Sequence, residues 1–136
     1  MQTKETQFLR NVLRIDALTC LGTGAASVVL SSVLGGLFGL SPGLLQGSGV
    51  VLLAVGAFIL YAAKNVPALR WPVWVVVLGN AGWVLASVLL LISGLEQPTA
   101  LGTAFVLAQA LVVAVLAELE YVGLRKIGGP AAVAVR

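Results

Sequence analysis

Five polar side chains that could do chemistry stand within long apolar stretches of this chain. Three are acids, Asp16, Glu118 and Glu120, and two are amides, Asn80 and Gln109. Ionisable groups inside hydrocarbon are costly, so they mark candidate functional sites. The three acids could form a proton- or cation-handling cluster at the cytoplasmic mouth of a helix bundle. The two amides could line a substrate site, or they could simply join helices by hydrogen bonds worth about 1 kcal/mol each.

Helical spacing predicts which of the acids point inward. Asp16 shares a face with Leu9, Leu13 and Cys20, so it should point into the bundle. Glu118 and Glu120 lie about 160° apart on a helix, so they cannot face the same neighbour. Glu120 shares its face with Gln109, which makes Glu120 the inward group.

A structural interpretation of the acids stands beside the functional one. No basic residue lies three or four positions from Asp16 on its own face, so its expected partner is a cation from another helix end. The candidates are Lys64, Arg70, Arg125 and Lys126. On this interpretation, the acids belong to an ion-pair network that closes the cytoplasmic ends of the helices.

The composition removes several classes of chemistry. The chain has no histidine, one cysteine and one methionine, while hydrophobic residues make up 60% of it and charged residues 10%. Histidine-ligated haem, structural zinc, blue-copper and iron–sulfur sites need ligands that are missing here. A catalytic histidine is excluded for the same reason. We therefore predict no enzyme activity, no catalytic residue, no cofactor and no metal site, and no binding of nucleic acid.

Four apolar runs must position these polar residues. The runs cover residues 15–40, 44–63, 72–95 and 99–122, and each is long enough to cross a bilayer. Residues 4–14 have a polar face and an apolar face, which is typical of a helix that lies in the membrane interface. Residues 127–136 are expected to form a loose tail. The fold class predicted is all-α: a single transmembrane domain, residues 1–136, forming a polytopic four-helix bundle.

The basic residues predict the orientation of this bundle. All eight Lys and Arg residues precede the first run, follow the fourth, or lie between the second and third. Because Lys and Arg of short loops stay on the cytoplasmic side, both termini should be cytoplasmic. The two hairpins also align weakly, with Gly24 on Gly79 and Pro42 on Pro98. This alignment indicates either a duplicated helical hairpin or a chance match of Val/Leu/Gly-rich helices.

The third run and the small-residue pairs predict how helices pack. One arc of the third run should face the bundle and the opposite one lipid. The inward arc holds Gly79, Asn80, Trp83, Ala86, Ser87, Ser93 and Gly94, and the lipid arc holds Val77, Leu78, Leu85, Val88, Leu89 and Ile92. Pairs such as Gly22/Ala26, Gly35/Gly39 and Gly43/Gly47 should let helix backbones approach closely.

The chain resembles small four-span bacterial inner-membrane proteins of unassigned function. The resemblance rests on three stretches, Leu13-Arg14-Ile15-Asp16-Ala17, Asn80 with Trp83, and Glu118-Leu119-Glu120-Tyr121. In size and topology alone it is also similar to the DoxX-type proteins. The resemblance implies a bacterial plasma membrane location and no particular activity.

Two functions remain open from the sequence. One is an accessory, scaffold or interaction subunit, with the lipid bilayer and other membrane subunits or a second copy as partners. The alternative is a small transporter or channel, with Asp16, Asn80, Gln109 and Glu120 lining a polar path.

Overall fold

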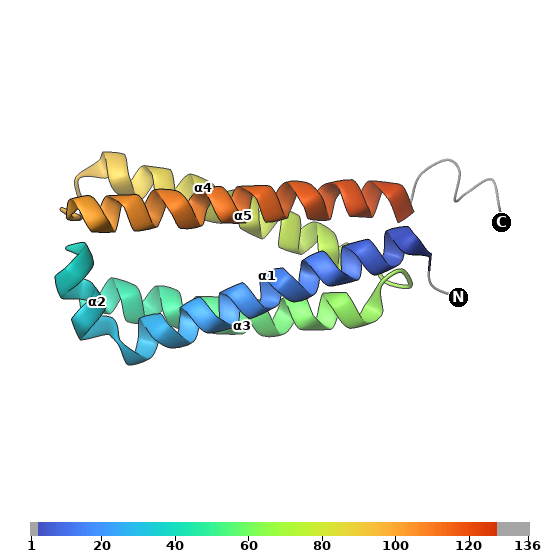
Figure 1. The fold of residues 1–136 in the computed structure, drawn as a ribbon, viewed down its shortest axis with the longest axis horizontal. Helices are drawn as coiled ribbons and strands as arrows, with labels where there is room; N and C mark the ends of the chain where they lie inside the picture. The colour runs from blue at the N-terminus through green and yellow to red at the C-terminus, as the bar shows by residue number, and fades with distance from the viewer. Residues whose placement is uncertain (1–2, 128–136) are drawn as a thin grey trace.

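The computed structural model describes residues 3–127 and places them in five helices (Figure 1). The helices are α1 Lys4–Val29, α2 Ser31–Phe38, α3 Pro42–Asn65, α4 Trp71–Ser93 and α5 Ala100–Ile127. All but α2 are long and apolar enough to cross a membrane. The predicted all-helical fold with four candidate membrane spans is therefore confirmed. The expected tail lies outside the described residues except for Ile127, which ends α5.

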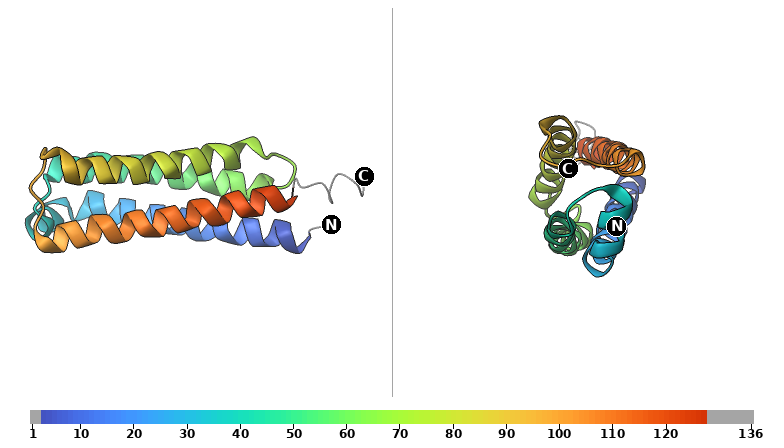
Figure 2. Two further views of the ribbon diagram at one scale, coloured as in Figure 1. Left: turned by 90° about the horizontal axis from the view of Figure 1, so that it is seen from above. Right: turned by 90° about the vertical axis from the view of Figure 1, so that its left-hand side faces the viewer.

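The four long helices form an elongated bundle in which successive long helices run in opposite directions (Figures 1 and 2). One end of the bundle holds the start of α1, the end of α5 and the connection from α3 to α4, and we call it the terminal end. The opposite end holds α2 and the connection from α4 to α5, and we call it the α2 end. Within the bundle, α1 packs mainly on α3 and α4 mainly on α5.

The stretch 15–40, expected to be one span, contains most of α1 and all of α2. The backbone of Leu30 leaves the helical conformation with φ −107° and ψ 23°, which separates the two helices. Gly39 then ends α2 with a φ of 67°, a left-handed conformation that glycine adopts readily. The short α2 packs against α3 and α5, so it closes the α2 end of the bundle.

Residues 4–14, expected to lie in the interface, form the first turns of α1 and belong to the bundle. Leu9 and Leu13 are fully buried. Arg10, on the polar face of this segment, donates from Nε to the carbonyl of Ala63 at 2.9 Å and from Nη2 to that of Val66 at 2.6 Å. These carbonyls lie at the C-terminal end of α3, where a helix leaves acceptors unpaired. Arg10 therefore ties α1 to the end of α3.

The buried face of α4 is partly the predicted one. Asn80 and Ser87 are buried, and most of the predicted lipid-facing side chains are exposed. The prediction was wrong for Gly79, Ser93 and Gly94, which are exposed. Gly79 has no atom within 4 Å of the position where a Cβ would stand. The inward face is instead completed by Val73 and Val76, because at the terminal end the core requires bulky side chains from α4.

Most of the glycines at close backbone contacts are not the ones that were predicted. A Cβ on Gly24 would stand 2.8 Å from the carbonyl oxygen of Gly49, so these two glycines allow α1 and α3 to cross closely. Gly102 lies directly against the carbonyl of Phe38 in α2. Gly22, Gly43 and Gly47 have nothing within 4 Å of a Cβ position, so the contacts predicted there were wrong.

Candidate functional site

Asp16, Asn80 and Glu120 meet inside the bundle, and we call them the acid cluster. They come from α1, α4 and α5, and their side chains are 1%, 6% and 0% exposed, respectively. The amide nitrogen of Asn80 donates to Asp16 Oδ2 at 2.8 Å and to Glu120 Oε1 at 2.9 Å. Three residues that lie far apart in the sequence are therefore joined through one amide group.

The two carboxyl groups of the acid cluster lie close together inside the bundle. Both accept a hydrogen bond from the same amide nitrogen, Nδ2 of Asn80. Two like charges at a short separation in a buried site repel each other strongly. Glu120 Oε2 is buried and has no hydrogen-bond partner among the described residues. The arrangement can hold one proton between two carboxyl groups.

The surroundings of the acid cluster are apolar. The core at the terminal end of the bundle consists of buried, mostly apolar residues: Leu9, Leu13, Ala17, Cys20, Ile59, Ala62, Ala63, Val66, Val73, Val76 and Leu124. Within residues 3–127, the pair has one further polar contact, from Cys20 Sγ, a weak donor, to Asp16 Oδ1 at 3.7 Å. This packing keeps water away from the carboxyl groups and strengthens their mutual electrostatic interaction.

The prediction that Asp16 pairs with a cation was wrong. Its contacts are the Asn80 amide and the Cys20 thiol, and no ion pair to Asp16 is present within residues 3–127. The basic candidates lie at helix ends, where Lys64 and Arg125 are exposed. Arg10, which does reach into the bundle, is engaged with the carbonyls at the end of α3. A neutral amide therefore occupies the place that the sequence suggested for a countercharge.

A second polar group lies nearer the α2 end, and we call Trp83, Ser87 and Gln109 the amide cluster. Trp83 Nε1 donates to Gln109 Oε1 at 2.8 Å. Gln109 Nε2 donates to Ser87 Oγ at 2.9 Å and to the Val106 carbonyl at 2.8 Å. Gln109 is thus separate from the acid cluster, although both join α4 to α5.

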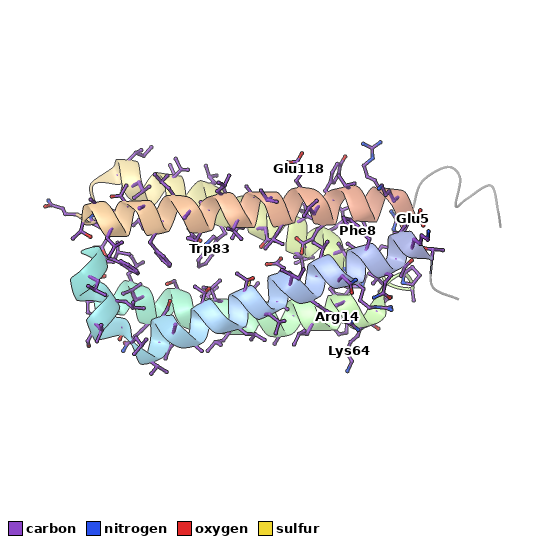
Figure 3. The ribbon with its side chains drawn as sticks, viewed as in Figure 1. Glu5, Phe8, Arg14, Lys64, Trp83 and Glu118 are labelled. Atoms are coloured by element: carbon purple, nitrogen blue, oxygen red, sulfur yellow. The ribbon has the colours of Figure 1, made fainter. Side chains whose placement is uncertain are left out.

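A partly open cavity of about 250 Å³ lies beside the amide cluster, between helices α1, α3, α4 and α5. Figure 3 shows Trp83 projecting into the space between the two helix pairs. The polar residues that line the cavity are Thr23, Ser27, Ser48, Trp83, Ser87 and Gln109, and apolar side chains from α3, α4 and α5 form much of the remaining wall. This cavity is the concave feature that a small ligand could occupy.

One polar face of α1, which was not among the sequence-based predictions, runs from the acid cluster to the cavity beside the amide cluster. Asp16, Cys20, Thr23 and Ser27 follow one another at spacings of three and four residues, which places them on one side of the helix. Asp16 belongs to the acid cluster, while Thr23 and Ser27 line the cavity. The regular spacing of small polar residues along one buried face was the signal that could have revealed this path.

Glu118 stands apart from the other predicted residues. Its side chain is exposed, and Figure 3 shows it pointing away from the bundle. The predicted inward direction of Glu120 is confirmed by its complete burial. The five candidate residues therefore fall into three places: the acid cluster, the amide cluster and the outer face of α5.

Comparisons with known proteins add no identification. No family model matches the chain, and neither the curated proteins nor the solved structures searched gave a match.

Proposed function

We propose that this protein is a small membrane transporter or channel that handles protons at the acid cluster. The observation that carries the proposal is the pair of buried carboxyl groups on one amide, with one carboxyl oxygen left unpartnered. A purely structural junction would be complete with one carboxyl group and one amide. The second acid adds a site for a proton that can be taken up or released, as intramembrane acids do in proton-dependent carriers.

The polar face of α1 supplies a path for that proton. It leads from Asp16 past Cys20 to Thr23 and Ser27 at the cavity. Hydroxyl groups can both donate and accept hydrogen bonds, so they can pass a proton on or bind a ligand. In this proposal the terminal end faces the cytoplasm of a bacterial cell, the chain lies in the inner membrane, and the cavity is nearer the opposite surface.

Proton movement through reconstituted vesicles tests the proposal. Vesicles that carry the protein and a pH-sensitive dye inside are given a pH gradient with the membrane potential clamped. We expect the wild type to dissipate the gradient faster than empty vesicles, and Glu120→Gln to remove that difference, because the amide cannot release a proton. Glu118→Gln is the matched control on the same helix and should behave as wild type. A wild-type rate equal to that of empty vesicles contradicts the proposal.

An interaction subunit is the second candidate, and Glu118 is the observation that favours it. This carboxylate is exposed on a face of α5 that also exposes Leu111, Val115 and Leu119. A charged side chain among lipid-facing apolar residues is costly unless a partner supplies a countercharge. A basic residue on another membrane subunit, or on a second copy of this chain, would meet that need.

Assembly measured in native membranes tests the second candidate. We expect Glu118→Leu to reduce the yield of cross-linked dimer or of a co-purifying subunit about tenfold, a loss of roughly 1.4 kcal/mol. The control Val115→Leu, on the same face, should leave assembly unchanged. If both variants and the wild type run as the same monomer after cross-linking, the outer face of α5 is not an interface.

A further inference from the structure

The cavity near the α2 end has a lining that defines its ligand. Among residues 3–127, no charged side chain contributes to the wall, and the polar groups are hydroxyls, an indole and an amide. A charged ligand would be buried there without a countercharge, which is strongly unfavourable. The lining therefore selects an uncharged molecule.

The size of the cavity limits that molecule to a small one. An apolar cavity of about 150 Å³ holds benzene, and pockets for drug-sized ligands begin near 300 Å³. At about 250 Å³, this cavity has room for one ring with a few substituents.

The walls of the cavity favour an aromatic ring. Trp83 of α4 and Phe105 of α5 both line it. Phe105 is held in place by Phe38 of α2, with ring centroids 4.6 Å apart and planes inclined by 13°. Fixed aromatic side chains bind a further ring by offset or edge contacts worth about 0.5–1.5 kcal/mol beyond burial.

In the amide cluster, the N–H donors of Trp83 and Gln109 are already used in hydrogen bonds, whereas the Gln109 carbonyl oxygen can accept another. Trp83 gives its single N–H to Gln109, and both Gln109 amide hydrogens are used by Ser87 and Val106. The Gln109 carbonyl oxygen has room for a second hydrogen bond, because an amide oxygen can accept two. A ligand that meets this group must donate a hydrogen bond to it. The Thr23 and Ser27 hydroxyls on the same wall can complement a ligand oxygen.

We propose that this cavity binds an uncharged single-ring phenol, with the ring between Trp83 and Phe105 and the hydroxyl donating to Gln109. The inference deepens the proposed function by naming the class of ligand at the cavity end of the path. It rests on the proposed function only in assuming that the bound ligand is transported. Binding itself can be measured without any transport.

Quenching of Trp83 fluorescence by a brominated phenol tests the binding. Trp71→Phe and Trp74→Phe together leave Trp83 as the only tryptophan and keep aromatic rings at the two other sites. In lipid nanodiscs at neutral pH, 4-bromophenol should quench Trp83 with a saturating curve. Bromobenzene, which lacks the hydroxyl, should bind about fivefold more weakly, the effect of one hydrogen bond of about 1 kcal/mol.

Two further variants locate the site. Ala86→Phe places a ring at the cavity wall and should abolish saturation, whereas Leu85→Phe, on the lipid-facing side of the same helix, should not. Gln109→Leu should still bind both compounds but lose the preference for 4-bromophenol over bromobenzene. This variant tests the proposal even if Ala86→Phe fails to fold. The proposal is overturned if quenching rises linearly with 4-bromophenol and is the same in the parent double variant and in the parent with Ala86→Phe. That result would show only partition of the compound into lipid. Equal affinity for both compounds in the parent overturns the role of Gln109.

Loss of proton movement and loss of binding are separate outcomes. If 4-bromophenol saturates but vesicles show no proton movement, the proposed transport fails and the binding site stands. If proton movement depends on Glu120 but quenching is linear, the binding proposal fails and the proposed function stands.

Discussion

The two ends of the bundle differ in how completely they are packed. At the terminal end, Leu9, Leu13, Ile59 and Leu124 are fully buried, and the acid cluster is buried as well. Toward the α2 end, a smaller core formed by Leu40, Leu45 and Val106 lies beside a cavity of about 250 Å³. One chain therefore contains a sealed region and an open one within the same helices.

The cause of this difference is the size of the inward side chains. Near the α2 end the inward positions include Ser27, Ser48 and Ser87, and these small residues do not fill the space between the helix pairs. At the terminal end the inward positions include leucine, isoleucine and valine beside three alanines and a cysteine, and these side chains pack together. The comparison teaches that buried ionisable groups are placed where packing excludes water, while the space for a ligand is placed where polar residues are small and uncharged.

The largest expected effect comes from breaking the sealed end at Asn80. Asn80→Leu removes the donor shared by two buried carboxyl groups, and each unsatisfied buried acceptor costs about 1–3 kcal/mol. We expect the free energy of unfolding to fall by about 3 kcal/mol, measured by reversible unfolding in mixed detergent. Asn65→Leu is the control, since the Asn65 amide donates to the Tyr61 carbonyl of its own helix and to no other helix within residues 3–127. If the two variants lose equal stability, the acid cluster contributes nothing to the sealed end.

A middle-sized effect is expected where α2 closes the open end. A Cβ at position 102 would collide with the Phe38 carbonyl, so Gly102→Ala must move α2 or α5 at a cost of about 1–3 kcal/mol. Gly79→Ala meets no atom within 4 Å and should stabilise α4 by up to about 1 kcal/mol, because alanine is the better helix former. Thermal unfolding of both variants should thus shift in opposite directions. Shifts in the same direction would show that α2 does not rest on α5.

The smallest effect is expected from enlarging a side chain beside the cavity. Ser87→Leu removes one acceptor of Gln109 but finds free volume, so it should cost only about 1 kcal/mol, the value of an interhelical hydrogen bond. Ala17→Leu in the fully packed end should cost about 1–3 kcal/mol. Val88→Leu, which faces outward, should cost little. Unfolding in detergent ranks the three variants, and equal losses for Ser87→Leu and Ala17→Leu would remove the contrast in packing between the two ends.

The sequence by itself determined where the long apolar helices lie and which of the main polar side chains point into the bundle. Runs of apolar residues predict membrane-spanning helices because a backbone in hydrocarbon must satisfy its own hydrogen bonds. Helical periodicity correctly placed Asp16, Asn80 and Glu120 toward the interior. It also left Glu118 outside, since two residues separated by two positions on a helix face different directions.

Only the tertiary structure decided which inward residues meet. Periodicity gives a direction around one helix axis, but the depth at which α4 and α5 align with α1 depends on packing contacts such as Gly24 on Gly49 and Gly102 on Phe38. That alignment brings Asn80, and not a lysine or an arginine, to Asp16. It also separates Gln109 from Glu120 and leaves a cavity between the helix pairs, because the volume between helices depends on all of their side chains together.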